Sequence, residues 1–233
     1  YLLNKNVKSK IIFIFHNNPK EMRGSRTVKE RIFLAEKGID VPFEQINIMS
    51  GEHFNESHIN KVGTFRVPVL ELSNGLFLSE SIAICRYFEN ENSKIPLFGR
   101  TRLEQAIVEM WQRRVEYELL WPIAFVLRHG NPKMAILEEQ CEAWSVANKP
   151  RVMDGLKMLN QRVTHNRYVC GKDFTVADIT SIVALDFLKT ISVLILKIAI
   201  AIPIIINANV IISKGVIIEG SILGFDNLLI VAG

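Results

Sequence analysis

The 233-residue sequence contains only three cysteines, which stand far apart at Cys85, Cys141 and Cys170. No C-x-x-C pair occurs, which argues against a dithiol redox centre, a zinc site and a disulfide framework. We therefore expect no bound metal. Scattered free thiols suit a reducing compartment, so the sequence predicts a cytoplasmic location.

Clustered basic charge is also missing. The formal net charge is +4, no Lys/Arg block is longer than a pair, and no basic stripe carries interleaved aromatic residues. Proteins that bind nucleic acids usually concentrate Lys and Arg on one face or along one helix. We therefore expect no nucleic-acid partner.

Long uninterrupted apolar runs are absent as well. The most apolar segment, Val193–Ile206, is broken by Lys197 and Pro203 before it reaches membrane-spanning length, so no membrane partner is expected. Residues 190–233 are rich in isoleucine and nearly devoid of aromatic residues, and they show neither a repeat nor a helical period. This region is interpreted as a divergent tail of unclear structure.

What is present begins with short strand and helix patterns that alternate over residues 10–90. "KIIFIF" is a β-branched run typical of a buried strand, and "TVKERIFLAEKG" places Val28, Ile32 and Ala35 at helical spacing before Gly38. Such patterns predict the order strand, helix, strand, helix, strand, strand, helix. The last two strands are joined by a turn at Ser73-Asn74-Gly75. These elements are predicted at 10–15, 27–38, 43–48, 54–60, 67–72, 76–78 and 80–88.

From Arg100 onward the strand patterns stop. Long amphipathic stretches follow over 103–128, 132–146 and 150–165, with Pro132 and Pro150 expected to start helices. A polar connector, "NENSKIPLFGR", separates these stretches from the first region, so we expect a helical domain over 101–189.

A helix start is predicted at "DFTVADITSIVALDF". Thr175 is expected to cap the helix, and Asp178 to reach back to the Thr175 amide in a capping box. Because the neighbours of Asp178 are apolar, we expect its carboxylate to be buried. This motif serves folding.

The segment "VPVLELSNGLFLSESIAICRYFE" suggests a ligand site. A proline at the start of a strand lacks a ladder donor, so an extended peptide can pair with the adjacent Val67 backbone. The free amides of a helix that begins near Glu80 and Ser81 attract a carboxylate, and the Glu80 side chain can hold an ammonium. The alternative is that Glu80 and Ser81 only start a helix.

This segment resembles the glutathione-binding segment of the cytosolic glutathione transferases nearly residue for residue. "RIFLAEKGIDVPFEQINIMSGEH", "IVEMWQRRVEY" and "FTVADITSIVALDF" are similar to further motifs of that family, in family order, and the resemblance covers about Phe13 to Lys189. It implies an α/β thioredoxin-like N-terminal domain, an all-helical C-terminal domain and a homodimer.

The resemblance also implies roles for single residues. Val67 would pair with the cysteinyl backbone of glutathione, Pro68 would be cis, and Glu80 and Ser81 would hold the γ-glutamyl head. His53, in "GEH", stands where several classes place a side chain toward the glycine carboxylate. A solvated surface position is the alternative for His53.

The catalytic loop departs from the family pattern. "HNNPKEMRGSRTVKE" contains neither Tyr nor Cys. Its hydroxyls are Ser25 and, slightly further along, Thr27, and the resemblance to Ser-type members of the family makes Ser25 the candidate for the hydroxyl that faces the glutathione sulfur. Ser25 could equally be a helix cap. Tyr117 and Trp121 are candidates for an apolar acceptor pocket, although aromatic residues on such a helix more often belong to a core or an interface.

Two functions remain open. The first is an enzyme that conjugates glutathione, as co-substrate, to an apolar electrophile whose identity scattered pocket residues do not reveal. The second is a non-catalytic binding or assembly module of the same fold. A thiol reductase is disfavoured because the loop lacks its cysteine, and an isomerase of this fold stays open.

Overall fold

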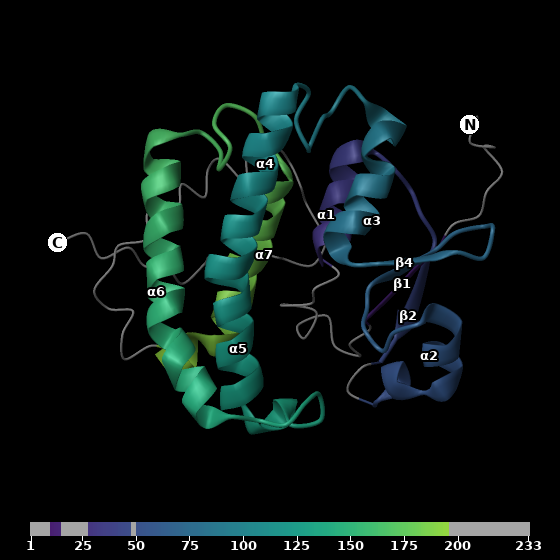
Figure 1. The fold of residues 1–233 in the computed structure, drawn as a ribbon, viewed down its shortest axis with the longest axis vertical. Coiled ribbons are helices and arrows are strands. Elements are labelled where there is room, and N and C mark those ends of the chain that lie inside the picture. Colours follow the sequence, from purple (N-terminus) through teal and green to yellow (C-terminus); the bar gives the residue numbers. More distant parts are fainter. Residues whose placement is uncertain (1–9, 15–27, 48–49, 196–233) are drawn as a thin grey trace. The chain divides into compact units, whose positions relative to one another are not determined.

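The computed structural model describes residues 10–14, 28–47 and 50–195, and the chain divides between Thr101 and Arg102 into two compact units. Figure 1 labels their helices and strands. Ser25 and most of the predicted tail lie outside the described residues.

A four-stranded sheet forms the centre of the first unit, with strand order β2-β1-β3-β4. β1 is parallel to β2, whereas β1 and β3, and β3 and β4, are antiparallel. Ile12 stands opposite Glu44 on one side and Val69 on the other, so β1 is a central strand. The strands span Lys10–Ile14 (β1), Phe43–Ile46 (β2), Val69–Glu71 (β3) and Phe77–Ser79 (β4).

The predicted turns and helices of this unit are present. Leu72 and Leu76 close the expected hairpin with a 2.8 Å backbone hydrogen bond, and Gly75 has φ 81°. α1 ends at Gly38, which has φ 64°, in a Schellman arrangement where the Ile39 amide donates to the Leu34 carbonyl. The helices are α1 (Val28–Lys37), α2 (Glu56–Val62) and α3 (Ser81–Phe88), with 3-10 turns at Glu52–Phe54 and Glu89–Asn92.

The buried face of α1 differs from the prediction. Ala35 is exposed, whereas Glu30, Phe33, Leu34 and Lys37 are buried. These four positions follow the i, i+3, i+4, i+7 spacing of one helical face, so the helix buries a charged residue at each end of its apolar stripe. α1 packs beside α3 on this face (Figure 1).

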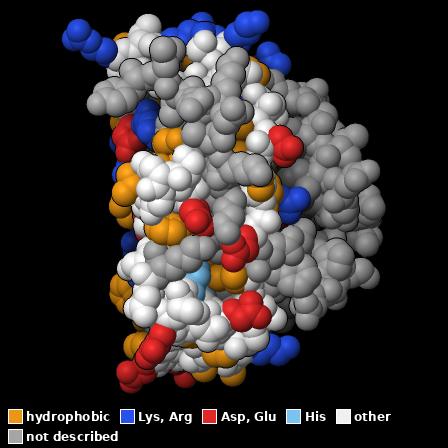
Figure 2. All heavy atoms as spheres, turned by 90° about the vertical axis from the view of Figure 1, so that its right-hand side faces the viewer, with side chains coloured by type: hydrophobic (Ala, Val, Ile, Leu, Met, Phe, Trp, Pro, Cys, Tyr) orange, Lys and Arg blue, Asp and Glu red, His pale blue; other side chains and the backbone are white. Residues whose placement is uncertain are grey.

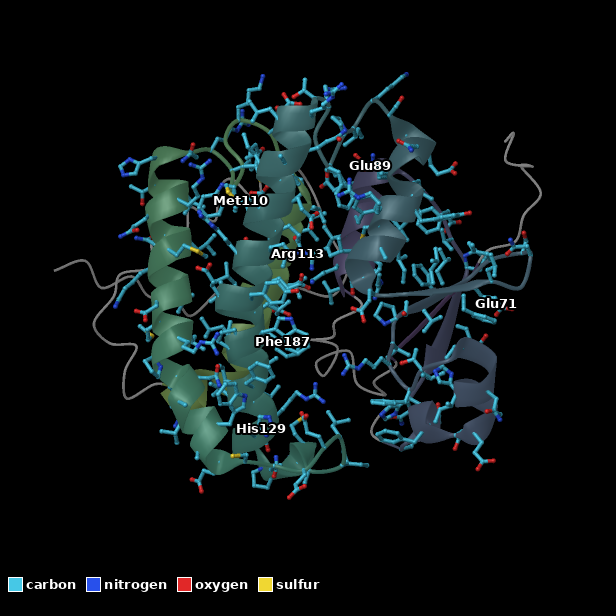
Figure 3. All side chains as sticks on the ribbon, viewed as in Figure 1. Glu71, Glu89, Met110, Arg113, His129 and Phe187 are labelled. Atoms are coloured by element: carbon cyan, nitrogen blue, oxygen red, sulfur yellow. The ribbon has the colours of Figure 1, made fainter. Side chains whose placement is uncertain are left out.

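The Lys37 ammonium joins the ends of these two helices. Lys37 is 1% exposed, and its Nζ donates to the carbonyl oxygens of Glu89 (2.7 Å), Asn92 (3.0 Å) and Ile95 (2.5 Å) and pairs with the Glu89 carboxylate at 2.7 Å. Glu89, labelled in Figure 3, also accepts the Phe98 amide at 3.0 Å, and Asn92 Nδ2 donates to the Lys37 carbonyl. One buried ammonium therefore satisfies the carbonyls at the end of α3 and in the turn that follows it.

The described residues of the second unit form helices and one isolated antiparallel bridge between Tyr168 and Gly171. Its core consists of apolar side chains from α4 to α7, including Val115, Leu119, Ile123, Leu156 and Ala184, all less than 5% exposed. The helices are α4 (Arg102–Val115), α5 (Trp121–Gly130), α6 (Glu142–His165) and α7 (Val176–Ile195), with a π turn at Glu116–Leu120 and a 3-10 turn at Pro132–Met134. α7 extends past residue 189, where the tail was expected to begin.

α6 packs closely against the π turn between α4 and α5. A Cβ atom added to Gly155 would lie 2.3 Å from the Glu118 carbonyl oxygen and 3.0 Å from its carbonyl carbon. Because the obstructing atoms belong to the backbone, only glycine fits at this helix crossing.

The predictions that Pro132 and Pro150 start helices were wrong. Pro132 begins only a short 3-10 turn, and Pro150 lies inside α6, eight residues after its first residue. The turn before Pro150 is held by buried polar side chains. Ser145 Oγ donates to the Val126 carbonyl at 3.0 Å, which ties the start of α6 to α5. Tertiary packing thus overrides the local proline signal.

One half of the predicted capping box of α7 is confirmed, the reach of Asp178 back to Thr175, whereas the Asp178 amide donates to the Thr175 carbonyl at 3.0 Å. The Asp178 carboxylate accepts the Thr175 amide at 2.8 Å and, with its other oxygen, the Val169 amide at 2.7 Å. The Thr175 hydroxyl donates to the same carboxylate at 2.9 Å. Burial is the main reason that the pKa of Asp178 rises to about 6, although these hydrogen bonds oppose the rise. Asp178 is 7% exposed, as expected.

We expect Lys37→Met to reduce the free energy of unfolding by about 3–5 kcal/mol, because it leaves a buried carboxylate and three carbonyl oxygens without their donor. Lys94→Met, which removes an exposed lysine from the same segment, should change the free energy by less than about 0.5 kcal/mol. Urea unfolding of the three proteins measures the difference. Equal unfolding midpoints for Lys37→Met and the wild type would contradict the structural role of this ammonium.

Candidate functional site

The candidate site lies where β3 begins and α3 starts. The Val67-Pro68 peptide bond is cis, which confirms the sequence prediction. Pro68 is buried and Val67 is half-buried. β3 begins only at Val69, so the Val67 backbone stands before the sheet ladder, where an extended ligand could pair with it.

Glu80 has an uncommon backbone conformation. Its φ of 72° and ψ of 120° make it a non-glycine residue with positive φ, immediately before α3 begins at Ser81. Such a conformation costs on the order of 1–3 kcal/mol and tends to occur at functional sites. The Glu80 carbonyl accepts the Ile84 amide at 3.0 Å, which starts the helix, while the Glu80 side chain is exposed. The first amides of α3 have no acceptor within the helix and can bind an anion.

Glu30 of α1 is a residue of this site that the sequence reasoning missed. It is 1% exposed, and neither carboxylate oxygen has a well-formed hydrogen bond to a described residue. Burial is the largest cause that raises the pKa of Glu30 to about 7, and the Glu80 carboxylate adds to the rise, while the Ser81 side chain and the Lys29 ammonium oppose it. The helical spacing from Phe33 was the available signal for its burial.

His53 is buried rather than solvated, so the surface interpretation of this residue was wrong. It is 5% exposed, and its ring lies 3.9 Å from the Phe54 ring, centroid to centroid. Burial, followed by the charge of His58, lowers the pKa of His53. Its Nδ1 has no hydrogen-bond partner among the described residues. Burial therefore favours the neutral imidazole, whose Nδ1 is itself buried.

The candidates for the acceptor pocket belong to the second unit. Tyr117 is 55% exposed in the π turn, and Trp121 is half-buried with its ring stacked on Phe125 at 5.4 Å. Tyr117 is therefore not a core residue. Trp111, by contrast, packs in the core.

Two of the three cysteines, Cys85 and Cys170, have thiols that burial makes harder to ionise. Burial raises the pKa of the Cys85 thiol well above its usual value and that of Cys170 to about 11.

The residues that the structure describes contain no group of three His, Cys, Asp or Glu side chains able to hold a metal ion. None of the described helices is long and apolar enough to cross a membrane. Figure 2 shows acidic, basic and apolar side chains interspersed on the face that it presents.

Comparison with protein families finds a match between residues 21–90 and the family model "Glutathione S-transferase, N-terminal domain". The chain is 32% identical over 190 residues to "Glutathione S-transferase 2" of Saccharomyces cerevisiae, with 80% of each chain covered. It is also 28% identical over 169 residues to "Probable elongation factor 1-gamma 1" of Arabidopsis thaliana, covering 70% of this chain but 39% of that protein.

Among solved structures, the crystal structure of Gtt2 from Saccharomyces cerevisiae superposes with a TM-score of 0.71. It is 29% identical and covers 79% of this chain and 87% of that one. These similarities confirm the expected thioredoxin-like domain followed by a helical domain.

The buried Glu30 carboxyl predicts a specific dependence of stability on pH. The folded chain holds a proton on Glu30 up to about pH 7, whereas the unfolded chain releases it near pH 4.5. The contribution of the protonated Glu30 carboxyl to the free energy of unfolding is therefore fully present below pH 4.5, and it is lost as the pH rises through 7. Glu30→Gln should become more stable than the wild type by up to roughly 3 kcal/mol between pH 5 and pH 8.

Urea unfolding at pH 5, 6, 7 and 8 measures this difference, with Glu91→Gln, an exposed carboxyl in the same unit, as the control. The contributions of the other titrating groups to the free energy of unfolding are the same in the variant and the wild type, so they cancel in the difference. A constant difference across this pH range would show that Glu30 is ionised throughout.

Proposed function

The chain belongs to the glutathione S-transferase family, and on that premise we propose that it conjugates glutathione to electrophilic small molecules. The thiolate attacks an electrophilic carbon, a carbon–sulfur bond forms, and the leaving group departs with its electron pair while the thiol proton passes to solvent. Glutathione is the co-substrate, and no metal takes part.

One observation carries the proposal: Glu80 keeps a positive φ directly before an α3 terminus that offers free amides. This geometry turns the Glu80 carboxylate outward, beside the amides, so an ammonium and a carboxylate can bind next to each other. Such a pair is the α-amino acid head of the γ-glutamyl group. Ser81 adds a hydroxyl donor to the carboxylate, and the Val67 backbone pairs with the cysteinyl part of glutathione.

Two further contacts complete the proposed glutathione site. The neutral His53 imidazole donates a hydrogen bond to the glycine carboxylate, which requires its buried ring to become accessible to the ligand. Ser25 donates to the glutathione sulfur and favours the thiolate. Tyr117 and Trp121 supply apolar surface to the electrophile.

The proposal includes a homodimer located in the cytoplasm. Leu103 and Met110, at a spacing of seven residues on α4, are 70% and 41% exposed. We place the contact with a second copy of the chain at this face of α4.

A non-catalytic binding or assembly module is the second candidate. The similarity to a probable elongation factor 1-gamma favours it, together with a loop that lacks Tyr and Cys. Retention on immobilised glutathione, followed by a conjugation assay with a dinitro aryl chloride, separates the two functions. Retention with turnover supports the transferase, and retention without turnover supports the module.

We expect Ser81→Ala to weaken glutathione binding by about 1–2 kcal/mol, the usual contribution of a hydrogen bond to a charged group. Isothermal titration with glutathione measures the change. Ser93→Ala, which removes an exposed hydroxyl in the same unit, should bind like the wild type. An identical dissociation constant for Ser81→Ala and the wild type would remove Ser81 from the site.

Ser25→Ala tests the proposed activation of the thiol. A free thiol has a pKa of about 8.5, and a hydroxyl that donates to the sulfur lowers it by about one to two units. The pH–rate profile of conjugation should therefore move upward by about one to two pH units in the variant, and the rate at neutral pH should fall about tenfold or more. Ser57→Ala, on α2, is the control. An unchanged profile assigns Ser25 to a helix cap.

A further inference from the structure

Glu30 is a buried carboxyl without a good hydrogen-bond partner among the described residues, and it lies against the first turn of α3. It interacts with Ser81 and Glu80 at the helix start and with Cys85 one turn further along the same helix. Ser81 and Cys85 are four residues apart, so they share the face of α3 that packs on α1. The carboxyl therefore lies behind the amides that face the ligand.

Several groups surround this carboxyl. Lys29, on the same helix, is the nearby cation, Glu80 is the nearby anion, and the Cys85 thiol is neutral because burial raises its pKa well above the usual value. Among the residues that the structure describes, Lys29 is the cation that acts on Glu30 beside the Glu80 carboxylate. Burial and Glu80 together favour the neutral form of Glu30.

The N-terminus of a helix carries a partial positive charge that one anion can complement. An ionised Glu30 complements it from behind the helix, and a ligand carboxylate complements it from the front. The two anions therefore repel each other and compete for the same amides. When Glu30 is protonated, it carries no charge, so the ligand carboxylate binds the N-terminus of α3 without a competing anion.

We propose that Glu30 is a positioning residue of the glutathione site, and that its protonated form binds the γ-glutamyl carboxylate more tightly than its ionised form. The inference rests on the proposed function, because it needs the carboxylate of the ligand at α3. Binding then takes up a proton, and the affinity falls as the pH rises through the pKa of Glu30.

Titration of the wild type with S-methylglutathione tests this linkage, because this probe has no thiol and no group that titrates between pH 6 and pH 8. If the bound ligand raises the pKa of Glu30 from about 7 by one unit, affinity should be roughly fivefold weaker at pH 8 than at pH 6. Calorimetry at pH 7 in two buffers of different ionisation enthalpy should show uptake of a fraction of one proton.

Glu30→Gln should bind the probe with nearly the same affinity at both pH values, and its proton uptake should disappear. Glu91→Gln should behave like the wild type. A merely structural role for Glu30 would change affinity without changing the proton count. Proton uptake that is undiminished in Glu30→Gln belongs to another group, such as His53, and overturns the inference.

Three further results also overturn it. Equal affinity at pH 6 and pH 8 in the wild type leaves the proposed function intact but removes the linkage. An affinity that rises with pH, and falls in Glu30→Gln, means that Glu30 acts as an anion toward the ammonium of the ligand. No binding of S-methylglutathione by the wild type at any pH removes the proposed function and the inference together. Equal affinity at the two pH values, or absent proton uptake, in the wild type overturns the inference whether or not the variant folds.

Discussion

The pairing of α1 with α3 is the constraint on which the candidate site depends. Lys37, at the end of α1, is fixed to the carbonyl of Glu89 just after α3, and Glu30, near the start of α1, lies against Ser81 at the start of α3. The two helices therefore run in the same direction. Glu30 and Lys37 are seven residues apart, which is about 10 Å along α1. This distance is close to the length of α3. The Lys37 cation complements the dipole of α3 at its C-terminus, whereas the Glu30 carboxyl at the N-terminus complements it only when it is ionised.

This pairing explains how a short helix can support a strained residue. α3 has only eight residues and would be marginal alone. Its C-terminal end is held by the Lys37 network, and its apolar face is buried through Ile84 and Phe88. Because these contacts fix α3 against α1, the change of chain direction between β4 and α3 occurs at the residue before the helix, and Glu80 adopts the positive φ. The strain at the site is thus supported by contacts about two turns of helix away.

Much of this arrangement could be predicted from the sequence, because local patterns determine it. The Val67-Pro68 pair, the Asn74-Gly75 turn and the Thr175–Asp178 box act over a few residues, and each is present in the structure. The burial of Glu30 was not predicted, because "VKERIF" reads as a solvated first turn until the opposing helix is known. The continuation of α6 through Pro150 was missed for the same reason: distant packing decides it.

A carboxyl at position 30 is costly for folding alone. An apolar side chain at this position would pack against the same face of α3 without any dependence on pH, whereas a buried carboxyl near neutral pH must either lose its water or hold a proton. Proteins tolerate such costs mainly where function gains from them. Here the gain is an anion site whose strength follows the protonation of one residue. The charge that destabilises the helix pair is the same charge that sets how firmly the helix terminus holds a carboxylate.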